Sequence, residues 1–240
     1  MDTVQLASQL QAIRSALEQA AQTGGYPAPR LIAVTKNHPV EEILPLRGLG
    51  VEDIGENRVQ ETVAKLPALR ENFRIHLIGR LQSNKVKYII EDVASIQSVD
   101  RLSLAREIDR QANRVGRVVP VLVQVSPAGE PQKGGLPPEE LRDFLRQVSE
   151  MDGLRVKGLM AIMPNTEDEP YLDGLFAGMR RLFEQVRAEG IADIDMDELS
   201  MGMSHDYLLA ARHGATMVRI GTALLGARTA PAGTTRQEDA

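Results

Sequence analysis

The chain has 240 residues, of which 42% are hydrophobic and 25% charged, and its formal net charge is −5. Such an acidic chain, with four Phe, four Tyr and no Trp, lacks the basic and aromatic surface of a nucleic-acid-binding protein. It contains no cysteine, which excludes disulfides and thiolate metal sites and fits an intracellular protein. No stretch is long and apolar enough for a signal peptide or a membrane span. We therefore expect a soluble cytoplasmic protein with neither nucleic acid nor a membrane as partner.

Residues 2–22 predict an amphipathic helix, because leucine and isoleucine recur there at steps of three and four residues. From residue 31 onward, short apolar runs typical of buried strands alternate with helical patterns. The predicted strands are 31–35, 51–54, 75–78, 94–98, 118–125, 156–162, 197–201 and 216–220. The predicted helices among them are 39–49, 56–69, 82–90, 101–114, 137–150, 171–189 and 204–213.

The number of strands decides between two α/β architectures. Eight predicted strands in one continuous alternation with helices favour a closed (β/α)8 barrel, because a doubly wound sheet usually has five or six strands. No break in composition marks a second domain. We predict a single α/β domain over residues 1–228, a (β/α)8 TIM barrel with an extra N-terminal helix. The small, polar residues 229–240 are predicted to form a disordered tail.

The first predicted strand ends in a lysine, in the stretch LIAVTK at 31–36. Side chains two apart share a face of a strand, so Lys36 lies on the same side as Ile32 and Val34. In one interpretation the strand has reached the surface and Lys36 extends into water. In the other, Lys36 is a partly buried amine that can condense with a carbonyl. The stretch alone is compatible with both.

Two loops combine glycine with a helix start, at the end of a barrel where functional groups gather. Gly202 and Ser204 follow the seventh predicted strand, and Gly221 and Thr222 follow the eighth. Glycine lets a ligand approach the backbone closely, and the N–H groups at a helix start attract an anion. One such start is usually a simple cap, but phosphate sites in these barrels lie in these two loops. The pair therefore predicts a phosphate site.

Arg219 interrupts the eighth apolar strand and shares a face with Met217 and Gly221. If that face points into the barrel, the arginine needs an anion or a strong acceptor, and if it points outward it can pair with a helix carboxylate. The spacing leaves both open.

Other polar features favour structural interpretations. The four histidines have no metal-ligand spacing, so no metal site is predicted, and His76 within a strand is expected to be a core histidine with satisfied hydrogen bonds. Residues 83–88 predict a solvated helix face. Residues 129–135 predict a surface loop, or a flexible loop over the barrel mouth.

Six motifs in order carry a resemblance that covers residues 5–228. They are AVTK, GENRVQE, HLIGRLQSNKVK, GLMAIMP, LSMGMSHDYLLAARHG and TMVRIGTALLGAR. Together they resemble the pyridoxal phosphate homeostasis protein family, whose members are single-domain relatives of the alanine-racemase barrel, the fold type III of pyridoxal phosphate proteins. One departure is Ile75, where the family often has Trp before the histidine. We expect this difference to alter packing and not the cofactor site.

The resemblance implies a set of cofactor-binding residues. Lys36 would hold pyridoxal 5′-phosphate as a covalent aldimine, and Arg219 would face the ring nitrogen. The phosphate would be bound by Ser204, Gly221 and Thr222, with Ser200 or Gly202 nearby. The ring would be lined by Asn57 and by Met160 or Met163. The resemblance gives no role to His38, and it implies no catalytic residue.

The implied function is intracellular homeostasis of pyridoxal phosphate (vitamin B6) and amino acids, with little or no turnover. A permanent cation opposite the ring nitrogen disfavours the protonated ring that carbanion chemistry needs. The partners would be pyridoxal phosphate and enzymes that require it, and the protein would be a monomer or a weak homodimer. Two alternatives stay open: a racemase-like pyridoxal phosphate enzyme, and a Schiff-base aldolase that uses the same lysine without a cofactor.

Overall fold

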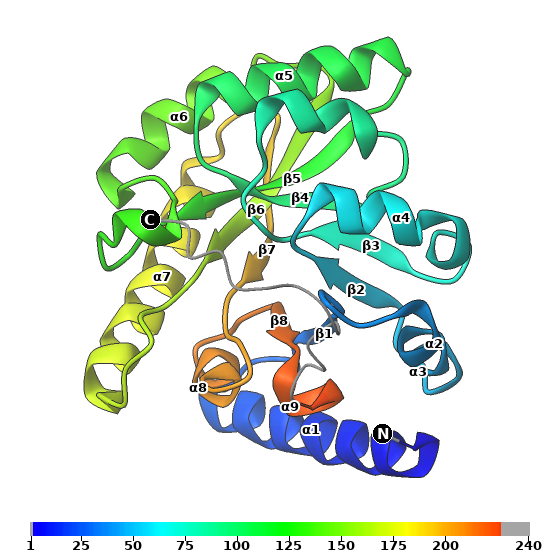
Figure 1. Ribbon diagram of the computed structural model, residues 1–240. Helices are drawn as coiled ribbons and strands as arrows, with labels where there is room; N and C mark the ends of the chain where they lie inside the picture. Colours follow the sequence, from blue (N-terminus) through cyan, green and yellow to red (C-terminus); the bar gives the residue numbers. More distant parts are fainter. Residues whose placement is uncertain (1, 227–240) are drawn as a thin grey trace.

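In the computed structural model, which describes residues 2–226, eight parallel strands form a closed barrel in chain order (Figure 1). The strands are β1 (Arg30–Val34), β2 (Asp53–Glu56), β3 (Arg74–Leu77), β4 (Ser95–Val99), β5 (Val119–Val125), β6 (Leu154–Ala161), β7 (Ile194–Ser200) and β8 (Met217–Ile220). The barrel closes because β1 pairs with both β2 and β8. The predicted (β/α)8 barrel is thus confirmed, and the predicted tail 229–240 lies outside the described residues.

The helices follow the predicted alternation with local differences. They are α1 (Thr3–Gly24), α2 (Val40–Ile43), α3 (Pro45–Gly48), α4 (Val59–Leu69), α5 (Leu102–Arg114), α6 (Leu141–Val148), α7 (Glu169–Glu189), α8 (Tyr207–Arg212) and α9 (Thr222–Leu225), with 3₁₀ segments η1 (Ser83–Tyr88), η2 (Pro131–Lys133) and η3 (Pro138–Glu140). The predicted helix 39–49 is two short helices, because Pro45 has no N–H to continue the first one. The predicted helix 82–90 is the 3₁₀ segment η1.

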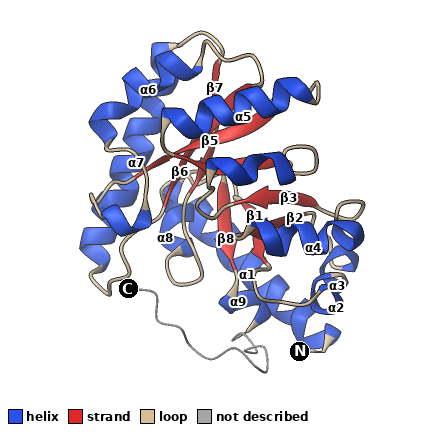
Figure 2. Cartoon of the chain, turned by 45° about the horizontal axis from the view of Figure 1, so that its top comes forward, coloured by secondary structure: helices blue, strands red, loops and turns tan. Residues whose placement is uncertain are grey.

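The extra N-terminal helix α1 packs against α8 and α9, on the side of the barrel where β8 meets β1 (Figures 1 and 2). Its start is capped by Asp2, whose carboxylate accepts a hydrogen bond from the Gln5 N–H at 2.8 Å. At its end, a Cβ on Gly24 would lie 1.9 Å from the carbonyl oxygen of Arg212, so only glycine permits this approach to α8. Close packing at this end holds the C-terminal end of α8 against α1.

Buried apolar side chains form two clusters, one on each face of the sheet. The larger cluster lies between strands and helices and includes Ala33 of β1. The smaller cluster fills the barrel interior with Ile32, Leu122, Met160 and Met217. The alternation along β1 therefore directs Ile32 inward and Ala33 outward, as expected for a strand buried on both faces.

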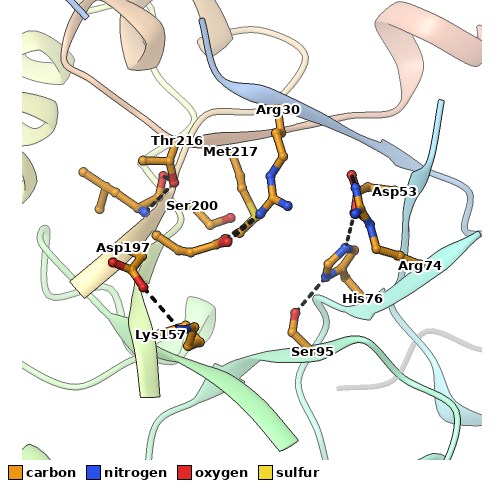
Figure 3. A network of polar contacts seen from close by, with 12 residues as sticks. Arg30, Asp53, Arg74, His76, Ser95, Lys157, Asp197, Ser200, Thr216 and Met217 are labelled. Atoms are coloured by element: carbon orange, nitrogen blue, oxygen red, sulfur yellow. Dashed lines mark hydrogen bonds and ion pairs between the residues drawn. The ribbon is translucent and has the colours of Figure 1, made fainter. Parts of the chain in front are cut away.

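Polar contacts connect neighbouring strands toward their N-terminal ends (Figure 3). Asp53 of β2 accepts hydrogen bonds from Arg74 at 2.8 and 2.9 Å and from His76 at 2.8 Å. The other ring nitrogen of His76 is 2.7 Å from the Ser95 hydroxyl, so both its nitrogens have partners, as predicted for a core histidine. At the same end, Arg30 of β1 pairs with Glu198 of β7 at 2.6 Å. This end of the barrel is thus occupied by internal polar contacts.

We predict that Asp53→Asn makes folding less sensitive to acid. Burial alone would raise the pKa of Asp53, but hydrogen bonds from His76 and Arg74 outweigh it and hold that pKa well below its ordinary value of 3.8. The carboxylate therefore stabilises the fold above about pH 4, and this stabilisation is lost as the pH falls further. Urea unfolding at pH 7 is expected to show a loss of about 1–3 kcal/mol for Asp53→Asn, and the difference from wild type should shrink at pH 3. Glu107→Gln, in an exposed pair with Arg110, serves as the control with a smaller effect. An undiminished difference at pH 3 would contradict the assignment.

Candidate functional site

A cavity of about 190 Å³ opens at the C-terminal ends of β1, β2, β7 and β8. Its walls combine apolar side chains at strand ends with polar groups in the loops that follow. The lining residues are Val34, Lys36, His38, Asn57, Ile78, Ile162, Met203, Ser204, His205, Arg219, Gly221, Thr222 and Gly226. This set brings together six of the residues predicted from the sequence, namely Lys36, Asn57, Ser204, Arg219, Gly221 and Thr222.

Lys36 follows the end of β1 by two residues and is partly buried in the cavity wall. Ile32 fills the barrel interior below it, and Val34 lines the same cavity. The alternation inferred from the sequence thus continues past the end of the strand. The interpretation in which Lys36 extends from a strand end into water is not what the structure shows.

The turn that carries Lys36 is anchored by Lys65 of α4. The Nζ atom of Lys65 donates to the carbonyl oxygen of Thr35 at 2.8 Å, to Glu56 Oε1 at 2.8 Å and to Glu61 Oε1 at 2.7 Å. Burial raises the pKa of Glu56, against the hydrogen bond and charge of Lys65. Its Oε2 atom is buried without a hydrogen-bond partner among the described residues. Lys65 is therefore the cation that makes this buried carboxylate tolerable.

The same network reaches the residue on the other side of Lys36. Asn37 has a left-handed backbone with φ of 63°, which asparagine tolerates better than most residues. Its N–H donates to Glu61 Oε1 at 2.5 Å, on the oxygen that Lys65 also binds. Both peptide groups flanking Lys36 are thus tied to one buried ammonium group, directly at Thr35 and through Glu61 at Asn37. This arrangement fixes the backbone from which the Lys36 side chain extends.

Arg219 points into the barrel and is 3% exposed. Its guanidinium donates to the Ser200 hydroxyl at 2.6 Å and to the carbonyl oxygen of Ala161 at 2.7 Å. Burial lowers the pKa of Arg219 to about 10, with the charge of Asp206 acting in the opposite direction. Arg219 is therefore still a cation at neutral pH, and the alternative in which it points outward is excluded.

The loops after β7 and β8 meet at Ser204. Its hydroxyl oxygen accepts hydrogen bonds from the N–H groups of Gly221 at 3.2 Å and Ala223 at 3.3 Å, at the start of α9. The loop before α8 is held in turn by Asp206, whose Oδ1 accepts from the Met203 N–H at 2.5 Å. The Ser204 hydroxyl and two backbone N–H groups thus lie together at one edge of the cavity, where the hydroxyl oxygen accepts the hydrogen bonds that a bound anion could otherwise accept.

Comparison with known proteins identifies the family to which the chain belongs. Residues 8–229 match the model of the family described as alanine racemase, N-terminal domain. The chain is also similar to the pyridoxal phosphate homeostasis protein of Aquifex aeolicus (strain VF5), with 40% identity over 220 residues, which are 91% of this chain and 95% of the relative. This chain belongs to the pyridoxal phosphate homeostasis protein family. The resemblance of the six motifs is confirmed.

Solved structures that are similar to this chain have the same fold. PipY of Synechococcus elongatus PCC7942 without pyridoxal phosphate superposes with a TM-score of 0.83, at 37% identity over 92% of this chain and 100% of that one. PipY with pyridoxal phosphate bound gives a TM-score of 0.81 at the same identity and coverage. The family also has a eukaryotic member in Schizosaccharomyces pombe, 35% identical over 223 residues, which are 91% of each chain.

Three residues predicted for the site do not line the cavity. Met160 belongs to the cluster inside the barrel, and Ile162, two residues further along the same face, takes the place at the wall. Ser200 is fully buried, where it supports Arg219 and donates to Gln97 at 2.8 Å. Gly202 has φ of 90°, and a Cβ there would lie 2.5 Å from Cβ of Ala210, so this glycine accommodates α8.

The cavity also contains histidines for which no role was predicted from the sequence. His38 is buried, and its Nδ1 lies 2.8 Å from Glu42 Oε2. His205 is more exposed and lies 3.5 Å from Asp206 Oδ2. The signal available for His38 was its place two residues after Lys36, at a strand end of the barrel mouth. Among residues 2–226, no group of three or more potential metal ligands comes together.

We predict that Lys65→Met strongly destabilises the protein, because it leaves the carboxylates of Glu56 and Glu61 without their cation. The expected loss in the free energy of unfolding is about 3–5 kcal/mol, measured by urea denaturation at pH 7. Lys157→Met is the matched control, since Lys157 also bridges two carboxylates, Asp195 and Asp197, but on the surface. Its loss is expected to stay below about 1 kcal/mol. Equal losses in the two variants would show that the buried network does not anchor the turn.

Proposed function

We propose that this chain binds pyridoxal phosphate in the cavity, attaches it covalently through Lys36 and keeps it available to enzymes that need it. The observation that carries the proposal is one cavity in which a partly buried lysine meets the Ser204 hydroxyl and the start of α9, in a chain 37% identical to PipY, whose structure has pyridoxal phosphate bound. Bound pyridoxal phosphate supplies an aldehyde, which reacts reversibly with a lysine amine. The proposed place of action is the cytoplasm, in pyridoxal phosphate and amino-acid homeostasis.

The donor set fits this cofactor. Ser204, Gly221 and Thr222 would bind the phosphate, and Lys36 lines the same cavity. Asn57 also lines it, and its Oδ1 is buried with no hydrogen-bond partner in the described part of the chain. A buried acceptor without a partner is costly, so a bound group that donates a hydrogen bond there would stabilise the complex. The fit therefore rests both on the donors available to the phosphate and on the Asn57 Oδ1 atom that lacks a hydrogen-bond partner among the described residues.

Arg219 supports a carrier with little or no turnover. Carbanion chemistry on pyridoxal phosphate is strongest when a carboxylate keeps the ring nitrogen protonated. The described lining of the cavity contains a buried arginine and neither Asp nor Glu. An arginine that retains its proton cannot play the part of that carboxylate. Reversible storage would need only the amine of Lys36 and hydrogen-bond donors for the phosphate.

We predict that Lys36→Ala loses the covalent cofactor. Protein incubated with pyridoxal phosphate and reduced with borohydride should gain the cofactor's mass on the peptide that contains Lys36, as measured by mass spectrometry. Lys157→Ala, at the opposite end of the barrel, should gain the same mass as wild type. Wild-type adduct confined to other lysines would overturn the assignment. A Lys36 adduct formed only from sugar carbonyls would favour the aldolase alternative.

We further predict that cofactor-loaded protein passes pyridoxal phosphate to an apo-enzyme faster than free cofactor accounts for. The measurement is recovery of the apo-enzyme's activity in the presence of a trap for free pyridoxal phosphate. Recovery no faster than dissociation into the trap would remove the delivery part of the proposal and leave storage. Incorporation of solvent deuterium at Cα of alanine at enzymic rates would favour the racemase-like alternative.

A further inference from the structure

A second, separate depression lies beside the cofactor cavity, at the C-terminal ends of β2 and β3. It has a volume of about 530 Å³ and shares Asn57 with the cavity. Four cationic side chains line it: Arg58, Arg80, Lys85 and Arg101. No Asp or Glu is among its lining residues in the described part of the chain. In a chain with a net charge of −5, this is a local excess of positive charge that the overall composition does not predict.

The two loops that form the depression are in direct backbone contact. A Cβ on Gly79 would lie 2.4 Å from the carbonyl oxygen of Asn57 and 2.7 Å from its Cα, so only glycine allows this approach. Arg58 and Arg80 each follow one of these two residues in the chain. Close contact between the loops therefore places the two arginines on the same depression although they lie 22 positions apart.

The wall of the depression is fixed before any ligand arrives. The hydroxyl of Ser98 donates to the carbonyl oxygen of Gly79 at 2.7 Å, and Arg101 donates to that of Leu81 at 2.7 Å. Arg101 is itself held by Asp100 at 2.7 Å. A wall held by internal hydrogen bonds loses little conformational freedom on binding, which favours affinity.

Three of the four cations have no carboxylate partner in the part of the chain that the structure describes. Arg58, Arg80 and Lys85 make no ion pair with any residue between 2 and 226, whereas Arg30, Arg142 and Arg155 elsewhere on the surface each pair with a carboxylate. The eleven-residue helix α4 also starts at this depression, and its N-cap residue Arg58 gives it no side-chain cap. The uncapped N–H groups of its first turn add partial positive charge to that of the guanidinium groups.

We propose that this depression binds a small phosphate-bearing anion with at least two negative charges, as a second ligand site distinct from the cofactor cavity. Guanidinium groups bind phosphate oxygens in a bidentate manner, and several converging cations are best matched by more than one negative charge. The volume is that of a small-molecule pocket, and the cations converge on one hollow and do not spread along a surface as a polypeptide partner would need. The site uses none of the residues proposed to hold the cofactor except Asn57 at its edge, so it stands whether or not the cofactor proposal does.

The test is titration of the protein with inorganic pyrophosphate by calorimetry, at an ionic strength kept constant with potassium chloride. The double variant Arg58→Gln/Arg80→Gln is expected to weaken binding by about tenfold or more. The control Arg106→Gln/Arg181→Gln removes the same charge from exposed positions elsewhere and should leave the affinity unchanged. Ser204→Ala, at the proposed phosphate seat of the cofactor, should also leave pyrophosphate binding unchanged. Both double variants should still form the borohydride-stable adduct on Lys36, which separates failure of this site from failure of the cofactor site.

Four outcomes would overturn the proposal. The first is no measurable binding of pyrophosphate to wild-type protein. The second is equal weakening by the two double variants, which would show a general effect of net charge. The third is loss of binding in Ser204→Ala but not in Arg58→Gln/Arg80→Gln, which would place the anion in the cofactor cavity. The fourth is tighter binding of a hexaglutamate peptide than of pyrophosphate, which would identify the surface as a docking site for an acidic polypeptide.

Discussion

Three hydrogen bonds from one buried ammonium group, that of Lys65, determine where the lysine at the mouth of the barrel can lie. They hold the carbonyl group of Thr35 and, through Glu61, the N–H group of Asn37. Alternation along β1 alone would direct Lys36 to the cavity side, but a strand end is free to fray or bend. Because both neighbouring peptide groups are held, the backbone of Lys36 is fixed in place as well as oriented toward the cavity. Reversible chemistry on its amine depends on this placement. The unpartnered Oε2 of Glu56 shows that this network is retained despite incomplete satisfaction of its own polar groups.

Two buried cations in this barrel, Lys65 and Arg219, are stabilised by different kinds of hydrogen-bond acceptor. Lys65 is paired with two carboxylates, so its charge is largely compensated where it lies. Arg219 instead donates to a hydroxyl and a carbonyl group, which satisfy its N–H groups without cancelling its charge. The first arrangement stabilises a turn, and the second leaves a positive potential directed into the cavity. A cavity that takes up a phosphorylated aldehyde gains from such a potential.

The architecture could be predicted well from the sequence because eight buried strands appear as apolar runs that alternate regularly with helical patterns. Parallel strands covered on both faces appear as continuous apolar runs, and their number is enough to select the closed barrel. Local helix type was harder, since η1 differs from an α-helix by hydrogen-bond geometry that composition does not encode. For the site, the rule that functional groups follow strand ends located Lys36, Ser204 and Gly221 at the cavity. The rule does not predict how far below the barrel mouth a residue lies. Met160 was therefore expected at the cavity wall, which Ile162 forms instead.

What the sequence could not supply were contacts between elements far apart in the chain. Nothing in the spacing of the motif GENRVQE shows that Lys65, nine residues after Glu56, turns back to hold the turn after β1. Likewise, nothing in the sequence distinguishes Arg58 and Arg80 from other surface arginines. The contact of Gly79 with Asn57 places them on one depression. The two cases share a cause. In a closed barrel each loop touches those of its neighbours, so charges introduced one strand at a time are combined around the rim. The mouth of this barrel therefore brings two surfaces with arginine side chains next to each other, the cofactor cavity with Arg219 and the depression with Arg58 and Arg80.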